Sequence, residues 1–181
     1  MSLPRIETSR LELRPLAAGD VDDIQRLWVH PDVRKYLWDD EVISKEQAAS
    51  VVEESNALFR EKGFGLWGAY AREDSPLIGF CGYWFFHDPP QLQLLYGVAP
   101  AHWGKGFATE LAKAMIRYGF EEAAFDRVIA GTDAPNLASL RVMEKAGMTF
   151  DRRVFVNGLD TVYYTISREE FRADDSHFKV R

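Results

Sequence analysis

The sequence predicts an α/β (α+β) fold with about seven strands and about four helices. Short stretches of alternating apolar residues are separated by turns, and longer stretches show helical periodicity. One apolar strand also passes through a glycine-containing turn into an amphipathic helix. No repeat, low-complexity tract or long linker divides the chain, so we expect a single domain over residues 1–181.

The first half of the chain predicts a strand, two helices and three strands. Residues 11–14 alternate as a strand, and Asp20 precedes a helical apolar pattern that we expect it to cap. Ser44 and Gln47 form a capping box for the next helix, which is expected to end at Gly63. The strands are expected at residues 64–70, 77–86 and 92–98, with turns at 73–76 and 87–90.

The second half predicts a helix, a strand, a second helix and a closing hairpin. The first helix carries an apolar stripe at helical spacing from residue 107 to residue 118. Residues 127–131 are expected to form a short strand and residues 136–146 a short helix. The hairpin is expected at 149–156 and 161–167, turning at 157–158.

The glycine-containing turn has the features of a phosphate-binding loop. Gly104 and Gly106 lack a Cβ where the backbone turns tightly, the N–H groups of the following helical turn can bind an anion, and Lys105 adds a cation. Close packing alone also explains such a turn. The P-loop pattern fails because Gly106 follows Lys105, and the Rossmann pattern fails because Thr109 stands where a small residue is needed.

Composition excludes several function classes. A net charge of −6 without a Lys/Arg run argues against a nucleic-acid surface. The one cysteine, Cys81, excludes an intramolecular disulfide framework. No apolar run approaches the ~20 residues that span a bilayer, and the first residues lack a signal-peptide core. We expect a cytoplasmic protein with no membrane or nucleic-acid partner and no metal, as a monomer or homodimer.

Three segments in order resemble the GNAT N-acetyltransferase superfamily, in the branch of the RimJ/RimL ribosomal-protein N-acetyltransferases. They are residues 8–16, the Pro-x-x-Trp-Gly-Lys-Gly-x-Ala-Thr-Glu pattern at 100–110, and the Asn-x-x-Ser and Glu-Lys-x-Gly-Met elements at 136–148. Trp103 departs from the Gln or Arg of the general superfamily pattern. The resemblance implies the GNAT acyl-CoA N-acyltransferase fold over a core of about 8–168. Its mixed central sheet would splay apart between residues 92–98 and 127–131.

The same resemblance implies that acetyl-CoA is the cosubstrate. The turn would bind the CoA pyrophosphate, and backbone amides of the splayed strand would hold the pantetheine and face the acetyl carbonyl. Asn136 would bind the pantetheine arm, although capping a helix is an alternative role. The implied cofactor-binding residues are Gly97, Val98, Trp103, Gly104, Lys105, Gly106, Phe107, Ala108, Thr109 and Asn136.

Two catalytic positions, Ser139 and Gln93, follow from the resemblance. Ser139 is implied as the partner of the CoA sulfur, because the tyrosine that other branches carry four residues later is Met143 here. Gln93 stands where many relatives have a glutamate base, and an amide cannot accept a proton at neutral pH. Gln93 could instead orient water or the amine. His87 and Asp88 are candidate substitute bases, and both also suit the surface of a turn.

A site without a base favours low-pKa acceptors. At pH ~7.4 an α-amine of pKa ~7.8 is about a quarter neutral, against ~0.1% for a lysine. We therefore expect transfer to a protein N-terminal α-amine or a small amine, with Trp38 and Trp84 in the pocket. At most two of six aromatic residues are expected to line it: Trp28, Tyr36, Trp38, Trp84, Phe85 and Phe86. The alternatives are a catalytically weak acyl-CoA sensor module and a nucleotide-binding domain of another type.

Overall fold

The computed structural model describes residues 3–71, 75–156 and 158–181, so the turns expected at 73–76 and 157–158 lie partly outside the described residues. The helices are α1 (Val21–Trp28), α2 (Pro31–Arg34), α3 (Lys45–Lys62), α4 (Phe107–Glu121) and α5 (Leu137–Lys145), with 3-10 turns at Ala18–Asp20, Trp38–Asp40 and Pro100–His102. The strands are β1 (Ile6–Thr8), β2 (Glu12–Pro15), β3 (Leu66–Tyr70), β4 (Leu77–Phe86), β5 (Gln91–Val98), β6 (Arg127–Asp133), β7 (Thr149–Val156), β8 (Leu159–Ser167) and β9 (Phe178–Val180).

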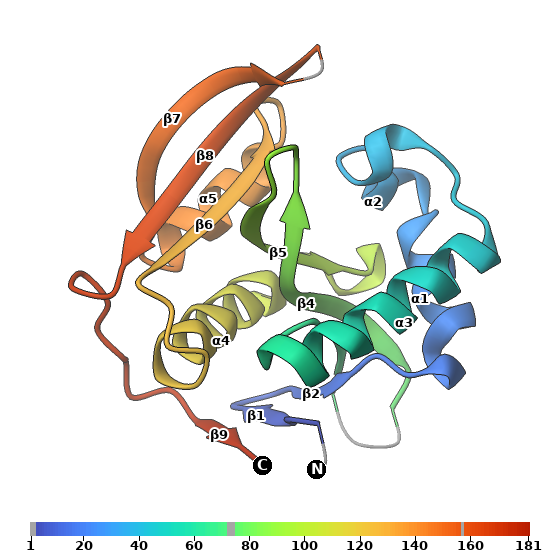
Figure 1. Ribbon diagram of the computed structural model, residues 1–181, viewed down its shortest axis with the longest axis horizontal. Coiled ribbons are helices and arrows are strands. Elements are labelled where there is room, and N and C mark those ends of the chain that lie inside the picture. Colours follow the sequence, from blue (N-terminus) through green and yellow to red (C-terminus); the bar gives the residue numbers. More distant parts are fainter. Residues whose placement is uncertain (1–2, 72–74, 157) are drawn as a thin grey trace.

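The strands form two sheets. The larger has the order β5-β4-β3-β2-β1-β9 and the smaller the order β6-β8-β7. Every ladder between described strands is antiparallel, rather than mixed as expected. The reason lies at the junction: β5 and β6 are joined by a helical crossover, which would make them parallel neighbours, but no ladder links them. The predicted splay is thus confirmed, and Figure 1 shows the smaller sheet standing apart.

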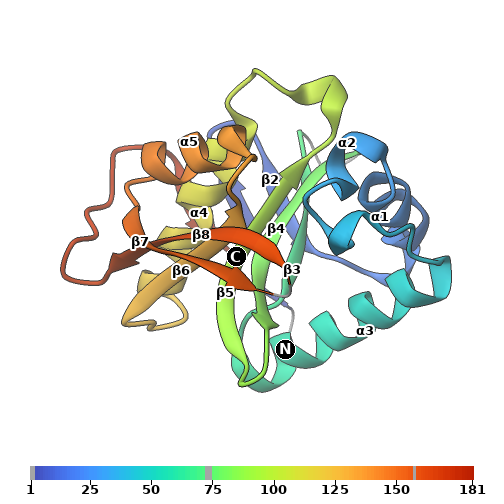
Figure 2. The same cartoon turned by 90° about the horizontal axis from the view of Figure 1, so that it is seen from above.

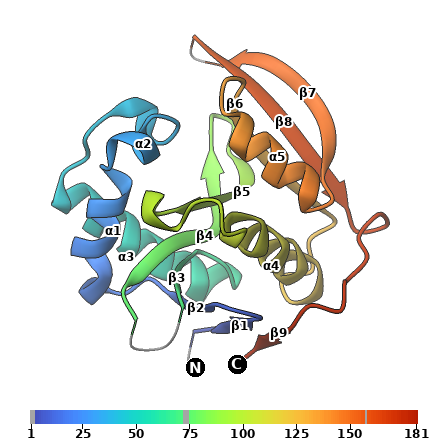
Figure 3. The same ribbon diagram turned by 180° about the vertical axis from the view of Figure 1, so that it is seen from behind.

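The helices cover the larger sheet from two sides. In Figures 2 and 3, α1 to α3 lie on one side of β4 and β5, and α4 and α5 lie on the other. Trp67 and Met115 are buried in one apolar cluster, and Trp28 and Phe80 in a second. No helix of the described chain is long and apolar enough to cross a bilayer.

Most local sequence signals hold, with differences at the helix starts and the chain ends. Gln47 N donates to Ser44 Oγ over 3.1 Å and Ser44 N to Gln47 Oε1 over 2.7 Å, which confirms the capping box. Asp20 was expected to cap α1, but its carboxylate accepts from Ala17 N and Tyr70 Oη instead. β1, β9 and α2 were not predicted from the sequence, and the first two pair with each other beside the termini (Figure 1).

Candidate active site

The glycine turn forms the start of α4. Gly104 and Gly106 have φ of 74° and 80°, the left-handed region that glycine adopts without strain. No side chain caps α4 at Gly106, so the N–H groups of its first turn remain available to a bound anion. Lys105 is exposed beside them, with Nζ 3.4 Å from the Ala101 carbonyl. These features fit the pyrophosphate of a coenzyme A thioester.

Trp103 braces this turn against the end of β5. Its indole Nε1 donates to the Val98 carbonyl over 2.7 Å, while about half of the residue, 52%, is exposed. This bond ties the turn to the strand that ends just before it. The departure from Gln or Arg at position 103 therefore has a structural role.

Arg10 holds the turn from outside. Its Nη1 donates to the Lys105 carbonyl over 2.8 Å, its Nε donates to Glu110 Oε2 over 2.7 Å, and its guanidinium carbon lies 4.5 Å from the centre of the Phe107 ring. Thr8 Oγ1 donates to the same Glu110 over 2.7 Å. Two of the recognised segments, 8–16 and 100–110, are therefore bonded to each other in the structure.

Arg10→Ala is expected to raise the KM for acetyl-CoA about threefold to tenfold with little change in kcat. The variant loses one half-exposed ion pair and the bond to the turn, which together stabilise the loop by about 1 kcal/mol. Initial rates at varied acetyl-CoA check this. Arg26→Ala, which removes an exposed pair with Asp23 at 3.0 Å on α1, is the matched control. An unchanged KM for Arg10→Ala would contradict the assigned role.

A cavity of about 530 Å³ lies where β5 and β6 diverge and extends to the aromatic side chains of α1 and β4. Its walls bring together five residues expected in the site: Trp38, Trp84, Gln93, Asn136 and Ser139. The expected limit of two aromatic lining residues is wrong, because Trp28, Tyr36 and Phe86 also line the cavity. The cavity lies beside the second apolar cluster, so rings that pack in or against that cluster, such as Trp28 and Trp84, also form the cavity wall. Phe85 points elsewhere and packs on Phe64.

The alternation of the β4–β5 ladder decides which amides face the gap. Ala99 N donates to Ile78 O over 2.8 Å, so the Ala99–Ile78 pair is hydrogen-bonded and the pairing alternates from there. Gly97 therefore bonds with Phe80 within the ladder, while the Val98 N–H turns away from β4 toward the unpaired side. Of the two expected amide donors, the geometry favours Val98.

Ser139 has a partner that sequence reasoning missed. Tyr96 Oη lies 2.9 Å from Ser139 Oγ, where either hydroxyl can donate, and it donates to the Ser139 carbonyl over 3.1 Å. Burial raises the pKa of Tyr96 to about 12, so the phenol keeps its proton at neutral pH. A phenol from β5 thus comes beside Ser139 although position 143 holds a buried methionine. In the sequence, the one sign that Tyr96 belongs to the site is its position two residues before Val98.

Asn136 caps α5 from its N-terminus. Its Oδ1 accepts from Ser139 N over 3.4 Å, and its Nδ2 donates to Thr132 Oγ1 over 2.9 Å. The capping role is therefore present. The side chain also lines the cavity, where its second amide hydrogen can reach a ligand.

Two carboxylates give the cavity a negative character. Both line it, Asp39 from the 3-10 turn at Trp38–Asp40 and Asp133 from the end of β6. Burial, and then the charges of Asp39 and Asp160, raise the pKa of Asp133. A cation entering the cavity would relieve this repulsion. Of the two candidate bases expected beside Gln93, His87 lines the cavity and Asp88 does not.

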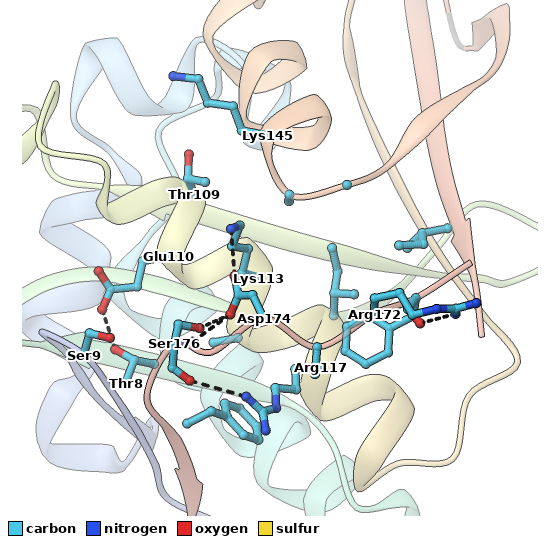
Figure 4. A pocket seen from close by; sticks show the side chains of 18 of the residues that line it. Thr8, Ser9, Thr109, Glu110, Lys113, Arg117, Lys145, Arg172, Asp174 and Ser176 are labelled. Atoms are coloured by element: carbon cyan, nitrogen blue, oxygen red, sulfur yellow. Dashed lines mark hydrogen bonds and ion pairs between the residues drawn. The ribbon is translucent and has the colours of Figure 1, made fainter. Parts of the chain in front are cut away.

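A second cavity, of about 540 Å³, lies on the outer face of α4 under the C-terminal segment. Lys113 Nζ donates to Asp174 over 2.9 Å, and Arg117 Nη1 donates to the Ser176 carbonyl over 3.4 Å, as Figure 4 shows. These bonds fasten the segment that leads to β9. Thr109 was expected to bind the cofactor, and it stands at the rim of this cavity (Figure 4).

Comparison with known proteins agrees with this geometry. The family profile described as "Acetyltransferase (GNAT) domain" matches residues 10–149. The chain is 32% identical to the uncharacterized N-acetyltransferase YoaA of Bacillus subtilis, over 90% of this chain and 96% of that protein. It is also 32% identical to FsC-acetyl coenzyme A-N(2)-transacetylase of Aspergillus fumigatus, over 93% of this chain and 78% of that protein.

The structure of RimL, the ribosomal L7/L12 α-N-protein acetyltransferase, in complex with coenzyme A superposes with a TM-score of 0.74 at 17% identity. The match covers 89% of this chain and 98% of that chain. That last likeness concerns the fold alone. The matched profile spans most of the residues that build the site, and the chain belongs to the GNAT family of acetyltransferases.

Proposed function

We propose that this chain transfers the acetyl group of acetyl-CoA to a low-pKa amine, either a protein N-terminal α-amine or a small-molecule amine. The observation that carries the proposal is the cavity of about 530 Å³ that joins the gap between β5 and β6 to the aromatic wall. A thioester threaded through the gap would meet an acceptor held against that wall. The name of one relative, FsC-acetyl coenzyme A-N(2)-transacetylase, supports an amine acceptor, since it describes transfer to an N2 position.

Charge and pKa favour such an acceptor. Asp39 and Asp133 attract an ammonium group into the cavity, where it must lose a proton before it can attack. Gln93, 5% exposed, donates through Nε2 to Gln91 Oε1 over 3.1 Å and cannot take that proton. An α-amine supplies the neutral form more readily than a lysine by two to three orders of magnitude.

The described residues supply two further roles. We assign the Val98 N–H, which turns away from β4, the hydrogen bond to the oxyanion that develops on the thioester carbonyl. We assign Ser139, whose Oγ lies 2.9 Å from Tyr96 Oη, the hydrogen bond to the sulfur as the C–S bond breaks. A free thiol of pKa about 8.5 leaves readily, so we assign this pair a supporting role in turnover.

Mass spectrometry of acetylated products tests the proposal. The protein is mixed with acetyl-CoA, unblocked lysine-containing peptides and small amines at two pH values. We expect the acetyl group on α-amines or other low-pKa amines. Efficient acetylation of lysine side chains would overturn the acceptor assignment. Binding of acetyl-CoA without transfer to any amine would overturn the catalytic proposal and favour an acyl-CoA sensor.

A further inference from the structure

The proposed function, on which this inference rests, leaves the proton of the attacking amine without an acceptor. Three described residues that line the cavity carry side chains able to accept a proton near neutral pH: His87, Asp39 and Asp133. Imidazole is the strongest base among these side-chain types at that pH. The two carboxylates face each other's charge and are suited to attracting the cation.

His87 is held in the cavity by a hydrogen bond to a neighbouring sheet. It lies in the turn between β4 and β5 with φ of 69°, an unusual conformation for a residue other than glycine. Its Nε2 is 2.9 Å from the Tyr163 hydroxyl of β8, so the bond crosses from one sheet to the other. Both residues line the cavity together with Gln93 and Ser139.

Tyr163 extends this contact to Gln93. A Cβ placed on Gly131 would lie 2.7 Å from Tyr163 Cε1 and 3.1 Å from Gln93 Oε1. A side chain at position 131 would therefore clash with both residues, and a hydrogen bond with Gln93 works against the rise in the pKa of Tyr163. His87, Tyr163 and Gln93 form a continuous polar path along one wall of the cavity.

Burial keeps Tyr163 a neutral hydrogen-bonding group. The Arg152 guanidinium carbon of β7 lies 4.2 Å from the centre of its ring, and Arg152 also pairs with Asp151. Burial raises the pKa of Tyr163, and Arg152 only partly opposes this. A protonated phenol donates to His87 Nε2 and offers its oxygen lone pairs to a second donor. The remaining ionisable groups on the cavity wall are Tyr36, Asp39, Tyr96 and Asp133.

We propose that His87 is the general base of the transfer and that the Tyr163 hydroxyl carries the proton to it. The amine nitrogen attacks the thioester carbonyl, forming the C–N bond and moving the carbonyl electron pair to oxygen. As the C–S bond breaks, the proton on nitrogen moves to the Tyr163 oxygen and the Tyr163 proton moves to His87 Nε2. The products are the amide, a thiolate that accepts a hydrogen bond from Ser139 and takes its proton from solvent, and an imidazolium that returns its proton to solvent.

His87→Gly tests this assignment with chemical rescue by imidazole. Glycine accepts the φ of 69° without strain and leaves a space for free imidazole. With an unblocked lysine-free peptide as acceptor, kcat is expected to fall at least about tenfold, and added imidazole to restore part of it. The acetyl-CoA affinity and the melting temperature should match the wild type. His177→Gly, which removes a surface histidine 3.1 Å from Glu7, is the matched control and should keep full activity without responding to imidazole.

Tyr163→Phe provides the second variant. It keeps the ring against Arg152 but removes the hydroxyl, so kcat is expected to fall without rescue by imidazole. The kcat of the double variant should lie within about threefold of the kcat of the slower single variant. The two losses do not multiply, because the two residues act in one proton path. Wild-type kcat in His87→Gly, or a loss that imidazole does not restore in a folded, acetyl-CoA-binding variant, would overturn the assignment alone. Failure of the wild type itself to acetylate any amine would overturn the proposed function and this assignment with it.

Discussion

Replacing Gly82 by alanine is expected to lower the free energy of unfolding by about 3 kcal/mol or more. A Cβ at this position would lie 2.1 Å from the Gly65 carbonyl oxygen and 2.9 Å from Leu66 Cα. Both are backbone atoms at the start of the neighbouring strand β3, so no side chain can rotate to make room. The same Gly65 oxygen accepts from Tyr83 N over 3.0 Å, a bond that the clash would break.

Urea denaturation of the purified variant measures this loss. Gly19→Ala is the matched control, because nothing lies within 4 Å of a Cβ there, and its stability should change by less than about 1 kcal/mol. Gly82 also pairs with Leu95 of β5, so a shift of β4 would move the wall that carries Gln93. A Gly82→Ala protein that unfolds at the wild-type urea concentration would contradict the close approach of β3 and β4.

Replacing Gly106 by valine is expected to weaken acetyl-CoA binding by about 10- to 100-fold. The residue has a φ of 80°, which a β-branched side chain avoids. The nearest atom to a new Cβ is Arg10 Nη2 at 3.5 Å, an ordinary contact, so the effect comes from the backbone conformation. The turn would relax, and the first amides of α4 would no longer point together toward the anion.

Isothermal titration with acetyl-CoA gives the affinity directly. Gly63→Val imposes a similar strain, with φ of 79° and open space around the Cβ, at the C-terminus of α3 instead. It should lose stability comparably yet bind acetyl-CoA with wild-type affinity. Equal weakening in both variants would indicate a general loss of structure and contradict the binding role of the turn.

Local signals predicted those parts of the fold that neighbouring residues decide. The Ser44–Gln47 capping box and the left-handed Gly63 depend on atoms within a few residues of one another, and both are present. Asp20 shows where such reasoning fails. Its carboxylate could cap α1, but it accepts from Ala17 N and from Tyr70 Oη, which is fifty residues away in sequence. β1 and β9 lie near opposite ends of the chain, and three-residue strands carry too little periodicity to be predicted.

The candidate site divides in the same way. The glycine turn was predictable because its chemistry lies in consecutive residues, and the expected Trp38, Trp84, Gln93 and Ser139 do share one cavity. Tyr96 was missed as the partner of Ser139 because the two residues lie on β5 and α5. The sequence also could not show which amide faces the gap. Successive N–H groups of a strand point to opposite sides, so the answer depends on the register of the β4–β5 ladder.

Sequence alone thus predicted the fold class and the position of the glycine turn, and it shows an amide at position 93, because periodicity, glycine and side-chain chemistry are properties of the chain itself. Only the folded chain joined Arg10 to Glu110, Tyr96 to Ser139 and His87 to Tyr163. Each of these pairs spans more than forty residues of the sequence. Hydrogen bonds act over about 3 Å, so such partners are decided by packing and cannot be found from spacing in the sequence.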